Sequence, residues 1–183
     1  SIGKVREYLG QSAVVLKAYA WTCMMGAEGL RNCAEISVLN NNYLQKKLEA
    51  IPGETTWYAK GHRRLEQVRY SWEKLAQETG VGTEDIMRRL GDFGIEHYWT
   101  SHHPWVVPEP FTLEPCETFS KDDLDEYAAV FERLAKEARE NPDFLKNAPY
   151  RCAAHKNKDP REFDDPAKWA TTWMAYTKKM GRK

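Results

Sequence analysis

Hydrophobic residues recur every three or four positions over the first fifty residues, which is the pattern of helices with one apolar face. The first run covers residues 5–20, and Gly26 interrupts the pattern. A second run covers residues 30–44, and the turn signal at residues 51–53 ends it. Two long helices joined by so short a turn predict an antiparallel helical hairpin over residues 1–50.

Short alternating runs follow this region and predict strands. Residues 55–58 and 64–70 are the first two candidates, and residues 111–114 are the third. Between them, Thr83 is expected to cap a short helix that stops near Gly94.

The clearest helix of the chain is expected to begin after Ser120. Ser120 and Asp123 have the spacing of a capping box, and an apolar stripe then runs to residue 138. Asn141-Pro142 is expected to end the helix.

The order of these elements predicts one α+β domain, in which a small antiparallel sheet of three or four strands is covered by helices. We divide it into a hairpin at residues 1–50, a core at residues 51–140 and a C-terminal extension at residues 141–183.

Composition narrows the possible functions. The chain has 183 residues, with 27 Lys and Arg against 27 Asp and Glu. This balance argues against nucleic acid, which needs a basic surface. No apolar run approaches the roughly 20 residues of a membrane helix. Four cysteines without a paired spacing (Cys23, Cys33, Cys116 and Cys152) predict mostly buried thiols in a reducing compartment, the cytoplasm.

Six blocks of residues together carry a family resemblance. They are residues 2–6 with 18–20, 25–31, Val38-Leu39-Asn40-Asn41-Asn42-Tyr43-Leu44, 79–81 with 85–94, Val107-Pro108-Glu109, and Glu114-Pro115-Cys116-Glu117-Thr118-Phe119-Ser120. In this order they resemble the P-protein of the glycine cleavage system, glycine dehydrogenase (decarboxylating), in its subunit 2 form.

The resemblance implies the C-terminal small domain of a fold type I pyridoxal-phosphate enzyme. It places the Schiff-base lysine and the phosphate site in a large domain upstream, so the cofactor belongs to the intact enzyme and this chain alone is expected to bind none. The family decarboxylates glycine and passes an aminomethyl group to a lipoyl carrier protein, and the cofactor supplies the electron sink. The expected partners are a large domain or subunit and that carrier, within a homo- or hetero-oligomer.

The chain departs from the family pattern at three places. Leu65 stands where the family has a histidine before Glu66, and Cys116 replaces a threonine. The segment after Gly94 has one extra residue before Pro104. These changes leave open whether glycine is the substrate.

The best-matching blocks supply candidates for lining the active site. They are Glu66, Glu114, Glu117, Thr118 and Ser120. Two simpler interpretations remain open, because Ser120 has the sequence of a helix cap and Glu66 has arginines nearby with which to pair.

Three further groups of polar residues attract attention. Asn40, Asn42 and Tyr43 are candidates for an interface or for packing, since Asn is a poor helix former. His102 and His103 are expected in a loop that lines the active site, and a zinc site with His97 and Cys116 is disfavoured because the ligands lack paired short spacings.

The dipeptide His155-Lys156 copies the family's cofactor-bearing pair, but it follows alanine and lies in the wrong part of the chain. We therefore predict that no catalytic residue lies in this chain and that the chain is inactive alone.

One alternative is a stand-alone binding or assembly module with exposed tryptophans, and another is a self-contained enzyme using His102, His103 and Glu114. The family assignment is expected to fail if the fold lacks a sheet or if the two long helices are not antiparallel.

Overall fold

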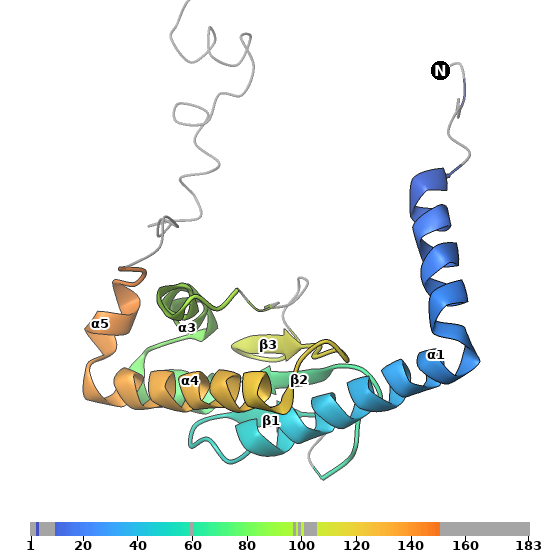
Figure 1. The fold of residues 1–183 in the computed structure, drawn as a ribbon. Coiled ribbons are helices and arrows are strands. Elements are labelled where there is room, and N and C mark those ends of the chain that lie inside the picture. Colours follow the sequence, from blue (N-terminus) through green and yellow to red (C-terminus); the bar gives the residue numbers. More distant parts are fainter. Residues whose placement is uncertain are drawn as a thin grey trace, which may run out of the picture.

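In the computed structural model, residues 3, 10–58, 61–96, 98, 100 and 106–150 are described. Their elements follow one another along the chain (Figure 1), namely α1 (Ser12–Leu48), β1 (Thr55–Trp57), β2 (Val68–Ser71), α2 (Glu73–Thr79), α3 (Thr83–Leu90), the 3-10 turn η1 (Gly91–Phe93), β3 (Pro110–Leu113), α4 (Lys121–Glu140) and α5 (Pro142–Lys146).

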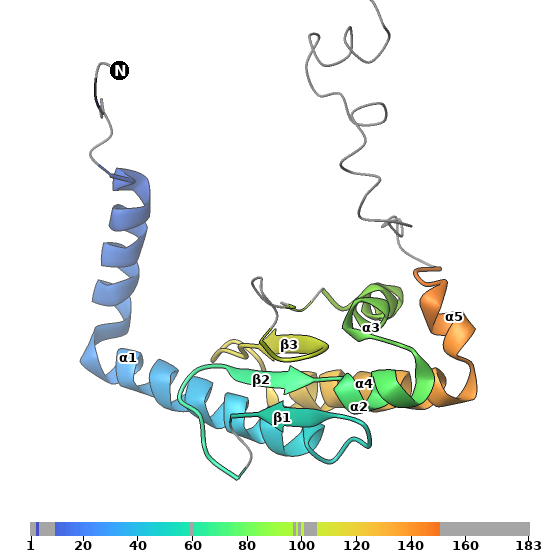
Figure 2. The same cartoon turned by 180° about the vertical axis from the view of Figure 1, so that it is seen from behind.

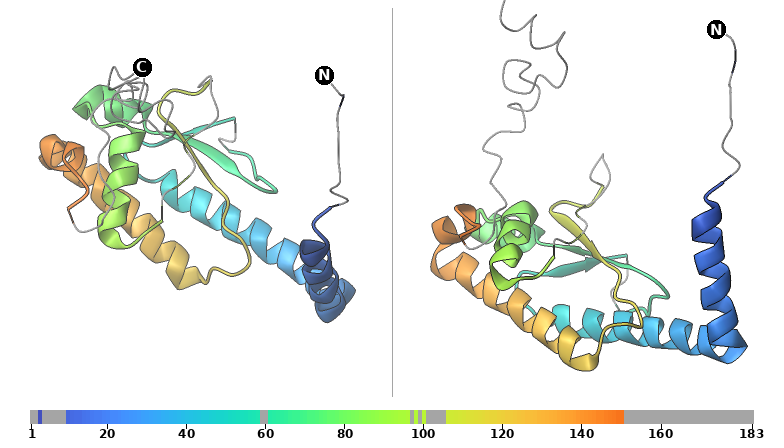
Figure 3. Two further views of the ribbon diagram at one scale, coloured as in Figure 1. Left: turned by 90° about the horizontal axis from the view of Figure 1, so that it is seen from above. Right: turned by 45° about the horizontal axis from the view of Figure 1, so that its top comes forward.

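The three strands form one antiparallel sheet in the order β1-β2-β3. Tyr70 of β2 lies opposite Thr56 of β1 and Phe111 of β3. The C-terminal half of α1 and the N-terminal half of α4 lie along the sheet, and α4 then continues past the strands beside α2 and α3 (Figures 2 and 3). The small antiparallel sheet with helices is thus confirmed, and each strand overlaps its predicted segment, although β2 begins four residues later than expected, at Val68.

Stacked aromatic rings fill the core between the sheet and α4. Phe111 lies 5.1 Å from Tyr70 and 5.2 Å from Trp72, and Trp72 lies 5.8 Å from Phe131, measured between ring centroids. Burial of large aromatic side chains contributes heavily to folding free energy. Trp72 is fully buried, so it does not belong to the exposed tryptophan surface that the alternative of a stand-alone binding module requires.

The predicted helical hairpin is wrong. Residues 12–48 form one helix that changes direction at Gly26, whose φ of 63° and ψ of −175° lie outside the helical region. The N-terminal half then leads away from the rest of the molecule instead of folding back (Figures 1 and 3). A single non-helical residue can bend a helix, but reversing its direction takes a loop of about 2–5 residues.

Capping explains where α3 and α4 begin. Ser120 Oγ accepts a hydrogen bond from Asp123 N (3.2 Å), and Asp123 Oδ2 accepts one from Ser120 N (2.8 Å), which confirms the predicted capping box. Thr83 does not cap α3, because Gly82 holds the cap position and donates its N–H to Asp85 Oδ2 (3.1 Å). The hydroxyl of Thr83 instead donates to the Pro110 carbonyl (3.1 Å) and so joins α3 to β3.

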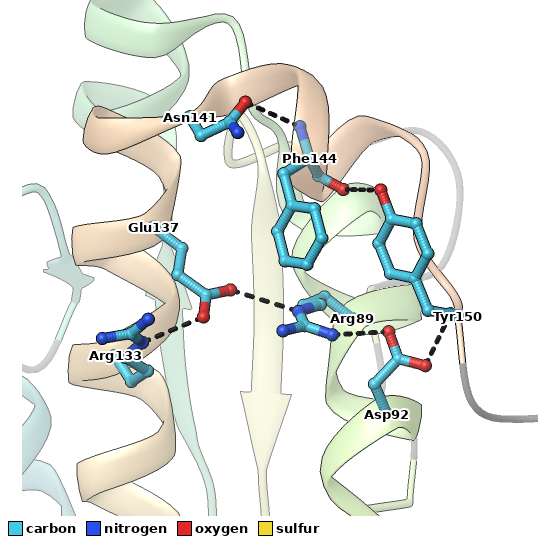
Figure 4. A network of polar contacts seen from close by, with 7 residues as sticks. All are labelled: Arg89, Asp92, Arg133, Glu137, Asn141, Phe144 and Tyr150. Carbon is cyan, nitrogen blue, oxygen red and sulfur yellow. Dashed lines mark hydrogen bonds and ion pairs between the residues drawn. The ribbon is translucent and has the colours of Figure 1, made fainter.

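Arg89 of α3 is the centre of a network that holds the end of the described chain (Figure 4). Its guanidinium contacts Asp92 Oδ2 at 2.8 Å and Glu137 Oε2 at 3.1 Å, and it lies over the rings of Phe144 and Tyr150. Burial disfavours its charge, but the hydrogen bonds to the two carboxylates outweigh burial and raise its pKa. The network attaches α5 to α3 and α4.

The core extends past both expected domain boundaries. Leu44 and Leu48 of α1 and Leu145 of α5 all belong to it.

The helices α2 and α5 were not predicted, because each is too short to show a clear period. The expectation of buried thiols was wrong for Cys23, which is exposed, while Cys33 and Cys116 are half-buried.

Candidate functional site

A cleft of about 810 Å³ lies beside β3. Its walls come from the end of β3 and the loop after it, the first turns of α4, the segment after η1, and Leu44 of α1. The apolar part of the lining includes Leu44, Phe93, Ile95, Leu113, Phe119 and Leu124. Mostly apolar walls with a few polar groups are typical of binding sites.

The charged groups of the cleft all carry one sign. Four acidic residues line it, namely Glu96, Glu114, Asp123 and Glu126. The described lining residues include no lysine or arginine. Asp123 is already engaged by the N–H and hydroxyl of Ser120, and these hydrogen bonds lower the pKa of its carboxyl. The other three carboxylates are the groups left to meet a ligand.

Two tyrosines form part of the wall. The Tyr98 hydroxyl lies 2.8 Å from Thr83 Oγ1 and also donates to the Thr83 carbonyl. Burial raises the pKa of Tyr98 and of Tyr127, so both phenols stay neutral near pH 7. They offer aromatic faces and a positioned hydroxyl, not a base.

Thr112 of β3 contributes an unusual polar group. The residue is 4% exposed, and its hydroxyl is buried without a hydrogen-bond partner among the described residues. A buried hydroxyl without a partner costs free energy, and side-chain atoms of Asn41, Tyr70 and Trp72 are in the same state. The strand pattern alone gave no reason to select this residue.

The predicted lining residues separate into two groups. Glu114 and Thr118 line the cleft. Glu117 faces α1, where its carboxylate accepts a hydrogen bond from Ser37 Oγ at 3.1 Å, and Ser120 serves as the cap of α4. Their roles in an active site stay predictions.

Glu66 is not among the residues that line the cleft. Glu66 is exposed in a bend before β2, and among the described residues no ion pair joins it to Arg64 or Arg69. His102 and His103 lie outside the described residues, as does His97. The described ranges contain no group of three or more His, Cys, Asp or Glu residues that could hold a metal ion.

Asn40, Asn42 and Tyr43 hold neighbouring segments within the domain. Asn40 Nδ2 donates to the carbonyls of Cys116 and Phe119, both at 2.9 Å, and so fixes the loop that borders the cleft. Asn42 exchanges hydrogen bonds with the backbone of Arg64 (2.7 and 2.9 Å).

The hydroxyl of Tyr43 donates to Asp125 Oδ1 (2.5 Å) and links α1 to α4. Lys47 and Lys121 contact the same carboxylate, at 2.8 and 2.6 Å. Hydrogen bonds from Lys121, Lys47 and Tyr43 lower the pKa of Asp125. The packing role proposed for these α1 residues is therefore observed, whereas a role between subunits stays a prediction.

Sequence reasoning missed Glu96, Glu126 and Thr112 as cleft residues. Glu126 lies three positions after Asp123 on α4, and this spacing places both residues on one face of a helix, which could have indicated Glu126 as a cleft residue.

Within the described helices, none is long and apolar enough to cross a membrane.

Comparisons with known proteins agree on one family. Residues 33–150 match the family model described as glycine dehydrogenase, C-terminal domain. The chain is 39% identical over 178 residues to the probable glycine dehydrogenase (decarboxylating) subunit 2 of Pyrococcus horikoshii, covering 96% of this chain and 34% of that protein. It is 46% identical over 153 residues to the protein of the same name from Thermotoga maritima, covering 82% and 31%.

A solved structure supports the fold. The crystal structure of glycine decarboxylase (P-protein) of the glycine cleavage system, in inhibitor-bound form, superimposes with a TM-score of 0.57 at 18% identity. The match covers 70% of this chain and 28% of that one. The chain thus spans about a third of the length of the relatives it matches.

Proposed function

The chain belongs to the family of glycine dehydrogenase C-terminal domains, and from that premise we propose that it completes the active-site cleft and a subunit or domain interface of a pyridoxal-phosphate-dependent glycine dehydrogenase (decarboxylating). The observation that carries the proposal is the family match over residues 33–150, to proteins of which this chain spans about a third. The catalytic lysine is assigned to the remaining two thirds.

The charges of the cleft support the assignment of the catalytic lysine to the rest of the enzyme. Pyridoxal phosphate needs a lysine for its aldehyde and donors or cations for its phosphate. The described lining has carboxylates and lacks lysine and arginine, so these residues do not fit the cofactor. We therefore assign the cofactor to the large domain and the outer wall of the active site to this chain.

The N-terminal half of α1 supplies a surface for the large domain. Its apolar side chains face solvent, with Leu16 66%, Tyr19 68% and Met24 76% exposed. A helix this short is marginal in water unless an apolar face is packed. We assign its packing partner to the large domain or subunit.

Several finer assignments belong to the same proposal. They are a lipoyl carrier protein as the acceptor of the product, a homo- or hetero-oligomer, a cytoplasmic location, and the division of the chain into residues 1–50, 51–140 and 141–183. Glycine is the proposed substrate because the relatives carry that activity in their names.

The exposed apolar surface of α1 also favours a second candidate, a stand-alone binding or assembly module. Contiguous exposed apolar patches mark protein-binding sites whether or not the partner is catalytic. Such a module would bind its partner without changing glycine turnover.

A hybrid enzyme separates the two candidates. In the hybrid, this chain replaces the matching third of the Thermotoga maritima relative, and glycine-dependent release of carbon dioxide is measured with pyridoxal phosphate and a lipoyl carrier protein. We expect turnover by the hybrid and none by the chain alone. Carbon dioxide release by the chain alone, or a hybrid that binds the cofactor but does not turn over glycine, would contradict the proposal.

A further inference from the structure

The N-terminal half of α1 has apolar side chains on every side. From Ser12 to Ala27, Lys17 is the only charged residue, and each residue from 12 to 24 is exposed in this chain. A helix that lies on a protein surface has one apolar face, whereas a helix that is apolar all round is buried on all sides. The composition of this segment therefore indicates an enclosed helix.

The apolar positions form two stripes on opposite sides of this helix. Each stripe contains three residues spaced by three and four positions, which aligns their side chains along one face. The first stripe is Val14, Ala18 and Trp21, and the second stripe is Leu16, Tyr19 and Cys23. Because about 3.6 residues make one turn, a shift of two positions leads to nearly the opposite side of the helix. One flat partner surface can therefore cover only one stripe.

This chain covers neither stripe. Val14 and Trp21 are 53% and 42% exposed, and Leu16 and Tyr19 are exposed further still. Among the described residues, the hydrophobic core includes none from the N-terminal half of α1, and this half leads away from the sheet (Figure 1). The surfaces that bury both stripes thus have to come from outside the chain.

Two observations separate this segment from the rest of α1. The match to the C-terminal domain family begins at residue 33, so it leaves out the N-terminal half of the helix. Gly26 divides the two halves with a φ of 63°, and a Cβ added there would meet nothing within 4 Å. The bend of the backbone therefore requires the glycine, and no close neighbour does.

The length of the relatives decides between two possible partners. A second copy of this helix could cover one stripe and would leave the opposite stripe in water. The Pyrococcus horikoshii relative matches 96% of this chain, and the match spans only 34% of that protein. The relative therefore carries this helix in one polypeptide with a much longer stretch of chain, which can surround it.

We propose that residues 12–25 are an enclosed helix of the large domain, that both stripes are buried there, and that the boundary between the two domains lies at Gly26, inside α1. The inference rests on the proposed function, because the large domain is the partner assigned there. It goes further by placing the helix inside that domain instead of on its surface.

Maleimide labelling of cysteines tests both stripes. Cys23 is an exposed native thiol on the second stripe, and Val14→Cys places a thiol on the first. Peptide mass spectrometry follows each thiol in the isolated chain and in a hybrid in which this chain replaces the matching third of the Pyrococcus horikoshii relative. We expect both thiols to react at least about tenfold more slowly in the hybrid. The control is Glu132→Cys at an exposed position of α4, which should react equally in both.

Loss of one aromatic ring from each stripe tests the same burial by stability. We expect Tyr19→Ala and Trp21→Ala each to lower the melting temperature of the hybrid by at least about 2 °C, because each leaves a cavity in a packed site. The isolated chain is the matched control, since both rings are exposed there and both variants should melt like the unchanged chain.

Three results would overturn the proposal. Protection of only one stripe, or a hybrid melting temperature that one of the two aromatic variants leaves unchanged, would mean that the helix lies on a surface. Rapid labelling of both thiols in the hybrid would mean that the helix stays in solvent. Slow labelling of both in the isolated chain would mean that copies of this chain cover each other.

Labelling is measured independently of turnover, so the two claims can fail separately. A hybrid that decarboxylates glycine while one stripe stays reactive overturns this inference and leaves the proposed function intact. A hybrid that binds the cofactor and protects both stripes without turning over glycine contradicts the proposed function and leaves the enclosed helix intact.

Discussion

Two adjacent asparagines in α1 are both buried but differ in their hydrogen bonds. Asn40 donates to two backbone carbonyls of the loop after β3. The amide nitrogen and oxygen of Asn41 are buried without any partner. Sequence reasoning selected Asn40 and passed over Asn41, and it could not separate them, because hydrogen bonding depends on which side of the helix meets another segment.

The pair gives a prediction at the residue scale. Asn40→Leu should lower the free energy of unfolding by about 1–3 kcal/mol, because the carbonyls of Cys116 and Phe119 both lose the hydrogen bond that Asn40 donates. Asn41→Leu should be neutral or stabilising, since it removes buried polar atoms that have no partner. Urea unfolding of both variants is the measurement, and destabilisation of equal size would show that volume, not hydrogen bonding, matters at this site.

Glu54 makes stability depend on pH. It is 8% exposed, and burial raises the pKa of its carboxyl from 4.5 to about 8. The folded chain therefore holds a proton that the unfolded chain has released, and stability falls as pH rises through this window. At about 1.4 kcal/mol per pKa unit, the fall is at most about 5 kcal/mol.

Glu54→Gln should remove this fall, because the neutral amide stays uncharged at every pH. Unfolding by urea at several values between about pH 5 and pH 8 measures the slope, with E132Q on exposed Glu132 as the control. A steep slope that survives in E54Q would assign the pH dependence to another group.

At the scale of elements, the network around Arg89 joins three helices that the sequence shows as separate pieces. Asp92 and Glu137 are almost wholly buried, and both pair with this guanidinium. Arg133 also contacts Glu137, at 2.9 Å, but its side chain is 53% exposed. Arg89 and Glu137 lie 48 positions apart in the sequence. No local sequence pattern could therefore predict that they pair.

Arg89→Met should therefore cost about 3 kcal/mol or more, because buried Asp92 and Glu137 both lose their contact with the Arg89 guanidinium. Arg133→Met should cost less than about 1 kcal/mol, as is usual for an exposed ion pair. The measurement is chemical unfolding, with limited proteolysis near residue 150 to show whether α5 detaches first. Equal costs in the two variants would mean that Arg89 is not the residue that holds α5.

The helix α1 shows where prediction of elements from a sequence stops. Apolar periodicity located both halves and Gly26 marked their junction, but period alone cannot distinguish a kink from a reversal. The antiparallel pairing was made a condition of the family assignment, and that condition failed although the family match stands. Contacts with α4 fix the C-terminal half, as the bond from Tyr43 to Asp125 shows, whereas the apolar side chains of the N-terminal half are exposed.

At the scale of the whole molecule, the fold was more predictable than the cleft. Strand alternation and the capping box at Ser120 are local signals, and both located their elements. The cleft combines Glu96, Thr112 and Glu126 from three separate elements, and only the packed chain brings them together. The family motif found Glu114 and Thr118 because it lies in the loop after β3, which borders the cleft.

The central claim is that this chain completes a cofactor site without holding the cofactor. The most direct test is to titrate the chain with pyridoxal phosphate, trap any Schiff base with borohydride and determine the intact mass, using the Thermotoga maritima hybrid as the positive control. We predict no stoichiometric adduct at a defined lysine of the chain and one adduct in the hybrid. A single stoichiometric adduct on the chain alone, particularly at Lys156, would show that the cofactor lysine lies in this chain and would contradict the account.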